Sequence, residues 1–301
     1  MSIKSDILKL KKEKNAVILA HYYVDDDVQD VADYIGDSFY LSKIATKVDQ
    51  DIIVFAGVEF MGESAKILNP DKKVLMPEMN ADCPMAHMAT KEEIIKIREQ
   101  YEDVAVVCYI NSTAELKTYS DVCVTSSNAV KIVKNLPNKN IFFIPDKNLG
   151  RFVASQVPEK NVILNDGFCP RHVAMTEAMV KETKAKYPNA KLAAHPECTE
   201  DVLKYADYIG STSGIIDYVV DTDCDEFIIA TVDGVFKEIR SKAPGKKLYT
   251  LMPEQVCVNM KLATLDKVLD VLENETNEVF VDEETAAKAM KPLNRMLELA
   301  K

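Results

Sequence analysis

Short apolar runs recur along the chain, separated by longer stretches in which apolar and charged residues follow a helical spacing. The clearest runs fall into three groups of three, at 17–23, 51–57 and 72–77, at 104–110, 140–146 and 160–166, and at 191–196, 226–232 and 246–252. Continuous apolar runs between helical stretches are typical of parallel strands that helices cover on both faces. The pattern therefore predicts an α/β protein.

The three groups also share short motifs. The pentapeptide "ADYIG" occurs at 32–36 and at 206–210, and "SDVCV" at 120–124 lies midway between them. When these segments are aligned, equivalent residues form four columns, which are the hydroxyls Ser38, Ser126 and Thr212; His21, Tyr109 and His195; Tyr23, Asn111 and Glu197; and the cysteines Cys83, Cys169 and Cys257. The agreement over so many positions indicates a triplicated unit.

The repeat predicts three α/β/α units with small parallel sheets, related by a pseudo-threefold axis. We expect the first unit, with an N-terminal helix, at 1–83, the second at 84–169 and the third at 170–257. The segment 258–301 is expected to form C-terminal helices that pack back on the first unit. Because ligands bind at the carboxyl ends of parallel strands, we expect all four columns to face one cavity on the axis.

The hydroxyl column has two interpretations. A Ser or Thr before a helix is commonly an N-cap that satisfies free backbone N–H groups. A helix start is also a place where carboxylates and phosphates bind, and three such starts around one cavity would suit anionic ligands.

The histidine and Glu197 columns predict proton chemistry. Two histidines in register, each following a strand, favour a functional role over a core role. Glu197 lies in "HPEC", a loop sequence, and is the candidate general base, with Tyr23 in the same column.

The cysteine column predicts a metal centre. Three thiolates on a threefold axis can hold three irons of a [4Fe–4S] cube and leave the fourth iron open as a Lewis acid. A zinc site of three cysteines and one histidine is the competing interpretation, with His87 or His172 as the fourth ligand. We expect both histidines to be structural, and Cys108, Cys123, Cys198 and Cys224 to be core residues.

Composition narrows the classes of partner. The chain has 301 residues and a formal net charge of −11, with no basic stripe, which argues against a nucleic-acid partner. No apolar run reaches the length of a membrane span, and the start lacks the apolar core of a signal peptide. Seven cysteines without a leader predict reduced thiols and a cytoplasmic protein.

Eight short motifs resemble those of the quinolinate synthase family. They are "HYY" at 21–23, "ADCPMA" at 81–86, "YIN" at 109–111, "TSSNA" at 125–129, "GFCPRH" at 167–172, "AHPEC" at 194–198, "GSTSGI" at 210–215 and "CVNMK" at 257–261. The resemblance implies a pseudo-threefold α/β fold with a [4Fe–4S] cluster on Cys83, Cys169 and Cys257. It also implies the condensation of iminoaspartate with dihydroxyacetone phosphate to quinolinate, phosphate and water, in NAD biosynthesis.

The resemblance further implies roles for individual residues. Tyr23, Tyr109, His195 and Glu197 are expected to be catalytic, with Tyr23 and Glu197 moving protons. The substrate-binding residues implied are His21, Ser38, Tyr109, Asn111, Ser126, His195, Glu197 and Thr212. An enzyme that supplies iminoaspartate is a possible partner. Two other functions stay open: a structural or sensory metal-cluster protein, and another cluster-dependent hydro-lyase.

Overall fold

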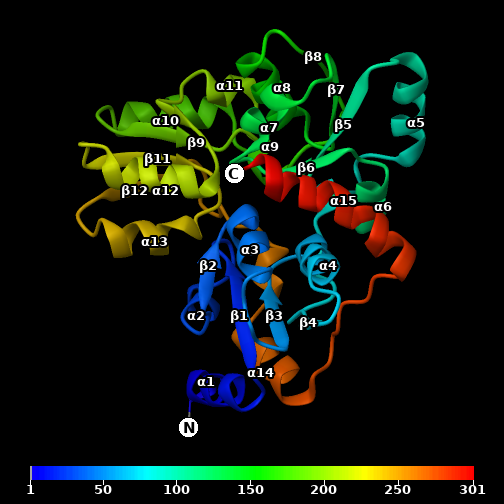
Figure 1. Ribbon diagram of the computed structural model, residues 1–301. Coiled ribbons are helices and arrows are strands. Elements are labelled where there is room, and N and C mark those ends of the chain that lie inside the picture. The colour runs from blue at the N-terminus through cyan, green and yellow to red at the C-terminus, as the bar shows by residue number, and fades with distance from the viewer. Residues whose placement is uncertain (1) are drawn as a thin grey trace.

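Three small parallel sheets are grouped around the centre of the molecule in the computed structural model, which describes residues 2–301 (Figure 1). Met1, which the first predicted unit includes, lies outside the described residues. Every strand pair within these sheets is parallel, and each sheet has four strands in the same order, with the first strand between the second and third. The predicted α/β fold of three repeated units is confirmed.

The first sheet has the order β2-β1-β3-β4. Its strands are β1 (Ala16–His21), β2 (Tyr34–Gly36), β3 (Ile52–Ala56) and β4 (Lys73–Leu75). The accompanying helices are α1 (Ile3–Glu13), α2 (Asp26–Gln29), α3 (Ser38–Ala45), α4 (Glu59–Leu68) and the 3₁₀ turn η1 (Pro84–His87). All residues of β1 and β3 are buried, as expected for strands covered on both faces.

The second sheet repeats this order as β6-β5-β7-β8. Its strands are β5 (Val104–Tyr109), β6 (Val122–Val124), β7 (Asn140–Ile144) and β8 (Asn161–Leu164). Its helices are α5 (Lys91–Gln100), α6 (Ala114–Thr118), α7 (Ala129–Asn135), α8 (Lys147–Gln156) and α9 (Pro170–Val173).

The third sheet has the order β10-β9-β11-β12. Its strands are β9 (Lys191–Ala194), β10 (Tyr208–Ile209), β11 (Glu226–Ala230) and β12 (Lys247–Thr250). Its helices are α10 (Glu177–Lys186), α11 (Glu200–Leu203), α12 (Thr212–Asp221), α13 (Val235–Lys242) and the 3₁₀ turn η2 (Met260–Leu262).

The aspartate of the repeated motif explains why the motif recurs. This aspartate follows a turn in each unit and contacts the first strand of its own sheet, as Asp33, Asp121 and Asp207. Their carboxylates accept a backbone N–H of that strand at 2.8, 2.7 and 2.7 Å, from Ile18, Val106 and Leu192. Each aspartate N–H also donates to the carbonyl of the same strand residue. The motif therefore fixes the register between the first two strands of every unit.

The two C-terminal helices pack differently. Helix α14 (Leu265–Asn274) lies against α1 and β3, in the first unit. Helix α15 (Glu283–Leu299) crosses α6 and β6 of the second unit and also touches α4 of the first (Figure 1). Its buried stripe of Ala289, Pro292, Leu293 and Met296 covers that seam. The expectation that both helices pack on the first unit is therefore wrong for α15, while the unit boundaries stay a prediction.

Within residues 2–301, the helices are too short or too polar to span a lipid bilayer.

Candidate functional site

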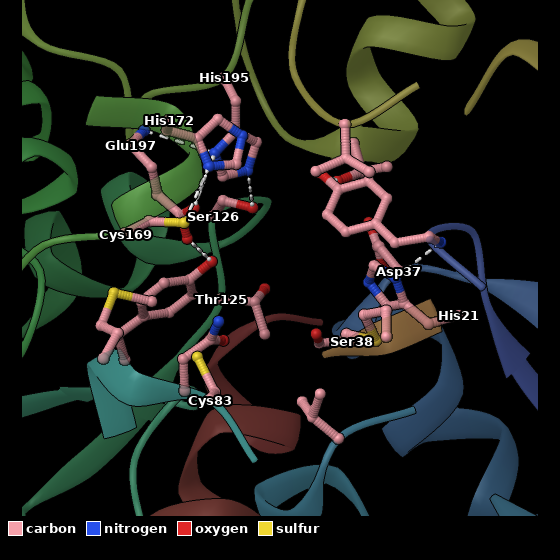
Figure 2. A pocket seen from close by; sticks show the side chains of 18 of the residues that line it. His21, Asp37, Ser38, Cys83, Thr125, Ser126, Cys169, His172, His195 and Glu197 are labelled. Carbon is pink, nitrogen blue, oxygen red and sulfur yellow. Dashed lines mark hydrogen bonds and ion pairs between the residues drawn. The ribbon is translucent and has the colours of Figure 1, made fainter. Parts of the chain in front are cut away.

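A cavity lies where the carboxyl ends of the three sheets converge, with side chains from all three units in its wall (Figure 2). All the predicted site residues line it except Cys257. The predicted residues in the wall are His21, Tyr23, Ser38, Cys83, Tyr109, Asn111, Ser126, Cys169, His195, Glu197 and Thr212. Asp37 and Thr125 also line the cavity, although the sequence did not single them out, and so does His172, which was weighed as a zinc ligand and expected to be structural.

The three cysteines share one local backbone arrangement. Each comes just before a short helical turn, and the N–H groups of the second and third residues after it donate to its sulfur. The donors are Met85 and Ala86 for Cys83, Arg171 and His172 for Cys169, and Asn259 and Met260 for Cys257. Two N–H donors per sulfur stabilise a thiolate, the form that binds metal.

The electrostatics of the three sulfurs also fit a metal centre. Burial raises the pKa of Cys83 to about 12, with a further contribution from Cys257. Burial raises the pKa of Cys169 well above its usual value, and Glu197 and Cys83 add to this. The pKa of Cys257 is raised mainly by burial. The charges of these sulfurs affect one another, so the three thiols can be deprotonated together only when a metal cation takes the place of their protons. The donor set therefore fits a thiolate-bound metal cluster.

The two histidines that the zinc interpretation needs lie in different surroundings. His87 is exposed and its Nε2 lies 2.7 Å from a carboxylate oxygen of Asp82, outside the cavity wall. His172 is buried, with Nδ1 2.7 Å from Oε2 of Glu197 and 3.2 Å from the sulfur of Cys169. Cys169, His172 and Glu197 are near enough to one another to hold a metal ion. His172 was expected to be structural, because the sequence does not show that the turn of α9 places it beside Glu197.

His21 and His195 have the same hydrogen-bonding arrangement. Nδ1 of His21 accepts the N–H of Tyr23 at 3.2 Å, and Nδ1 of His195 accepts the N–H of Glu197 at 3.3 Å. Each neutral ring therefore carries its proton on Nε2. For His195 that atom lies 3.1 Å from the hydroxyl of Ser126.

The pKa values of both rings favour the neutral form. Burial, with a smaller contribution from His195, lowers the pKa of His21 to about 3, while Glu197 acts in the opposite direction. Burial also lowers the pKa of His195 to about 4, although Glu197 opposes this. Near neutral pH, the two rings are uncharged hydrogen-bond donors.

Glu197 is held by two side chains on its two oxygens. The hydroxyl of Tyr109 donates to Oε1 at 2.6 Å, and Nδ1 of His172 lies 2.7 Å from Oε2. Burial by itself would raise the pKa of Glu197, but His195, His172 and the hydrogen bonds from His172 and Tyr109 lower it below its usual value. Glu197 is therefore an ionised carboxylate in a buried wall.

A chain of hydrogen bonds connects Glu197 to Tyr23. Nε2 of His172 lies 3.0 Å from the hydroxyl of Thr231, which lies 2.7 Å from the hydroxyl of Tyr23. The Tyr23 hydroxyl also contacts that of Thr212 at 2.9 Å, and burial raises the pKa of Tyr23. Thr231 was missed because its position directly after β11 carries no hydroxyl in the other two units.

The hydroxyl column does not cap its helices. Asp37 caps α3 by accepting the N–H of Tyr40 at 2.9 Å, and Ser211 caps α12 by accepting the N–H of Gly214 at 3.1 Å. Helix α7 begins after Asn128, two residues beyond Ser126. The N-cap interpretation of Ser38, Ser126 and Thr212 is therefore wrong. In the first and third units the preceding residue caps the helix, and in all three units the hydroxyl lies in the cavity wall.

The second unit contributes an unpaired acceptor. Oδ1 of Asn111 is buried and has no hydrogen-bond partner within the described residues 2–301. An unpaired buried carbonyl oxygen is costly unless a ligand supplies a donor. Figure 2 shows the wall divided into two sides, with His195, His172, Glu197 and Cys169 facing His21, Asp37 and Ser38.

Comparison with known proteins gives one consistent result. A family model described as "Quinolinate synthetase A protein" matches residues 5–298. A curated quinolinate synthase of Fusobacterium nucleatum subsp. nucleatum is 55% identical over 298 residues, covering 99% of each chain. Those of Sulfurihydrogenibium sp. and Caldicellulosiruptor saccharolyticus are 52% and 49% identical, covering 98% and 99% of this chain and 97% and 98% of theirs.

The family match covers nearly the whole chain, including all three repeated units and the cavity between them. The relatives match over almost their full length as well. The family suggested by the eight motifs is therefore confirmed. The chain belongs to the quinolinate synthetase A family, a family of enzymes of NAD biosynthesis.

Proposed function

We propose that this chain condenses iminoaspartate with dihydroxyacetone phosphate to give quinolinate, phosphate and water. The observation that carries the proposal is that two of the three equivalent cysteines line the same cavity as the hydrogen-bonded series from Glu197 to Tyr23. The names of the relatives support the same reaction. In outline, the two substrates supply the carbon and nitrogen atoms of a pyridine ring, which forms with loss of phosphate and water.

Anion binding would fall to neutral donors of the wall. His21 and His195 carry protons on Nε2, and the hydroxyls of Ser38, Ser126 and Thr212 lie beside helix starts. Two carboxylates and one phosphate need several such donors, and helix N-termini favour negative charge. The unpaired Oδ1 of Asn111 can accept a hydrogen bond from a substrate hydroxyl or imine N–H. These contacts would hold the two substrates side by side.

We propose that Cys83, Cys169 and Cys257 hold a [4Fe–4S] cluster. The shared N–H donors at each sulfur and the raised pKa values of the thiols support this assignment. When bound, such a cluster supplies an open iron that acts as a Lewis acid toward a carboxylate or hydroxyl and assists loss of water. Zinc with His87 as fourth ligand is disfavoured, because His87 is exposed and its Nε2 already lies 2.7 Å from the carboxylate of Asp82.

Proton transfer would run along the hydrogen-bonded chain. The raised pKa of Tyr23 keeps its hydroxyl protonated, so it can donate a proton to a leaving group. Once Glu197 has taken a proton from the substrate, His172 and Thr231 can pass a proton on to Tyr23 and restore its hydroxyl. Glu197 is ionised and can therefore accept a proton from the substrate. Burial keeps bulk water from the imine, which hydrolyses readily.

The polar wall argues against a purely structural cluster. A cluster that only joins three lobes has no use for a buried carboxylate, two neutral imidazoles and an unpaired amide oxygen beside it. Buried polar groups of this kind cost stability and gather at functional sites.

The test is an anaerobic assay with both named substrates, following quinolinate and phosphate release. We expect a brown protein with about four irons per chain and quinolinate formed at the rate of phosphate release. Stoichiometric zinc without iron would overturn the cluster, and iron without quinolinate would overturn the reaction. We also propose a cytoplasmic location, which cell fractionation would test, and delivery of the imine by the enzyme that supplies iminoaspartate, which a pull-down from cell extract would test.

A further inference from the structure

The threefold repeat allows one position to be compared in three copies within the same chain. The residue 37 positions after the first column is Val58 in the first unit, Asp146 in the second and Val232 in the third. In each unit the next residue donates its N–H to the carbonyl two residues before the cysteine. The pairs are Glu59 to Ala81 at 2.8 Å, Lys147 to Gly167 at 2.8 Å and Asp233 to Gln255 at 2.9 Å. The backbone thus places each cysteine loop in the same way.

Asp146 is the polar member of this column, and its side chain makes a contact that valine cannot make. It is fully buried, with one oxygen accepting the N–H of Leu149 at 2.7 Å and the other accepting the N–H of Cys169 at 3.0 Å. The first bond caps α8, and the second holds the backbone of the second cysteine. The second unit therefore has an additional connection between helix and cysteine loop.

Asn148 lies two residues further along, in the first turn of α8, and the amide nitrogen of its side chain contacts the third unit instead of the second. It is 3% exposed, and its Nδ2 donates to the backbone carbonyl of Glu197 at 3.1 Å. Glu197 belongs to the third unit, whereas Cys169 belongs to the second. Phe60 and Gly234, at the equivalent positions, have no amide to donate. One turn of α8 therefore contacts the loop of a cysteine and the loop of the buried carboxylate.

We propose that Asp146 and Asn148 are positioning residues that fix Glu197 relative to Cys169 across the seam between the second and third units. The inference rests on the proposed function, since it assigns Glu197 and Cys169 to one reaction site. Neither side chain belongs to the cavity wall. Both act through the backbone of another residue.

The packing of α8 makes this turn a firm reference point. Leu149, Gly150 and Val153 are buried against β7 and β8. A side chain at Gly150 would come within 2.7 Å of Leu164 and 3.0 Å of Phe143, so helix and sheet are in close contact. A helix held this tightly moves little, and its two polar side chains transmit that position to both loops.

The first experiment measures turnover in Asn148→Ala. Loss of the amide frees the Glu197 loop, and a displacement of about 1 Å at a catalytic group costs up to about 100-fold in rate. We expect kcat to fall about 10- to 100-fold, with KM for either substrate changed less than about 3-fold. The matched control is Ser155→Ala on the exposed side of the same helix, where the hydroxyl donates to the carbonyl of Phe152 and accepts from the exposed side chain of Gln156. A parental kcat in Asn148→Ala would overturn the role of Asn148.

The second experiment measures amide hydrogen exchange in Asp146→Val, which gives the second unit the residue of the other two. We expect the Cys169 amide to exchange at least about 10-fold faster than in the parental protein, while the peptides with Cys83 and Cys257 exchange as before. Asp146→Asn keeps one acceptor for the helix cap and serves if the valine variant does not fold. An unchanged rate at Cys169 in the folded variants would overturn the role of Asp146.

The exchange measurement needs neither iron nor substrate, so it separates the two ideas. If the parental protein fails to make quinolinate and Cys169 still loses protection in Asp146→Val, the positioning contact stands and the proposed function fails. If quinolinate forms and both variants behave as the parent, the function stands and the positioning inference fails.

Discussion

The loops at His21 and His195 have the same backbone design and different chemistry. In both, the histidine follows the first strand of its sheet and its Nδ1 accepts the N–H of the residue two positions later. In both, burial lowers the pKa of the ring, so that Nε2 presents a proton to the cavity. The difference lies in that later residue, which is Tyr23 in the first unit and Glu197 in the third.

This difference would let a repeat supply the proposed proton-transfer system. A phenol with a raised pKa holds its proton, and a carboxylate with a lowered pKa holds its charge. His172 and Thr231 connect the two groups by hydrogen bonds. Tyr23 and Glu197 thus occupy equivalent backbone positions and lie at the two ends of one hydrogen-bonded series. Their environments shift the two pKa values apart, as is typical of a paired acid and base.

The second unit provides the third version of the loop. Tyr109 takes the place of the histidine and donates to Glu197, while Asn111 takes the place of Tyr23 and Glu197. An amide neither gains nor loses a proton at ordinary pH. The comparison therefore predicts proton transfer by the first and third units and substrate orientation by the second.

The largest effect is expected from Glu197→Gln. Glutamine has nearly the same shape and can still accept from Tyr109, but it has no charge and cannot take a proton. We expect kcat to fall about 10²- to 10⁴-fold, the range for a lost acid–base group. Stopped assays for quinolinate measure the change.

The control for this variant is its iron content and stability, compared with those of the parental protein. Iron per chain, colour and melting temperature should stay near the parental values, because the cysteines keep all their N–H donors. A variant that turns over at the parental rate would contradict the assignment of Glu197.

The next effect is expected from Tyr23→Phe. The ring still fills its buried place, but the hydroxyl that contacts Thr212 and Thr231 is lost. We expect kcat to fall about 100-fold, with a smaller change in KM. Tyr22→Phe is the matched control, because the neighbouring hydroxyl bonds to Ser213 and lies outside the cavity wall. Equal losses in the two variants would show a general packing effect.

Much of the fold could be predicted from the sequence, because its information is local and repeated. Buried parallel strands produce continuous apolar runs, and Asp33 and its two equivalents make the same contact in every unit. Helix α15 was placed wrongly for a physical reason. Its apolar stripe fits any apolar surface of suitable size, and only the assembled seam between the first two units determines which one it covers.

The site could be predicted in part for a similar reason. Residues that repeat were found as columns, whereas His172 and Thr231 do not repeat and act through contacts across long sequence separations. The caps of α3 and α12 were misplaced by one residue because adjacent polar residues compete for the same N–H groups. Asp37 and Ser211 win that competition over Ser38 and Thr212.

Acid should destabilise both histidine loops. The rings have pKa values of about 3 and 4 when folded, against 6.5 when exposed. Below pH 6.5 the unfolded chain therefore binds more protons, so stability present above that pH is lost as the pH falls. Each ring contributes about 1.4 kcal/mol per pH unit. Urea unfolding between pH 6.5 and 5 measures how the free energy of unfolding changes with pH. In His21→Gln this slope should be smaller by the contribution of one histidine ring.

Carboxyl groups with raised pKa values, such as buried Asp146, are present in both proteins, so the difference in slope between parent and variant isolates the ring of His21. A slope in His21→Gln equal to that of the parent would mean that His21 is already charged in the folded protein. The comparison is sharpened by His195→Gln, since the nearby carboxylate of Glu197 makes the His195 ring the first of the two to protonate as the pH falls.

The smallest effect is expected from Ser126→Ala, which affects only the His195 side of the wall. The hydroxyl lies 3.1 Å from Nε2 of His195, and Asn128 rather than Ser126 stands at the start of α7. Loss of one neutral hydrogen bond costs about 1 kcal/mol, so KM should rise about 5-fold while the melting temperature stays nearly constant. Ser127→Ala is the control, because that neighbour is exposed and bonds to Thr125. An unchanged KM in Ser126→Ala would mean that this hydroxyl serves the imidazole alone and that the anion is bound from the His21 side.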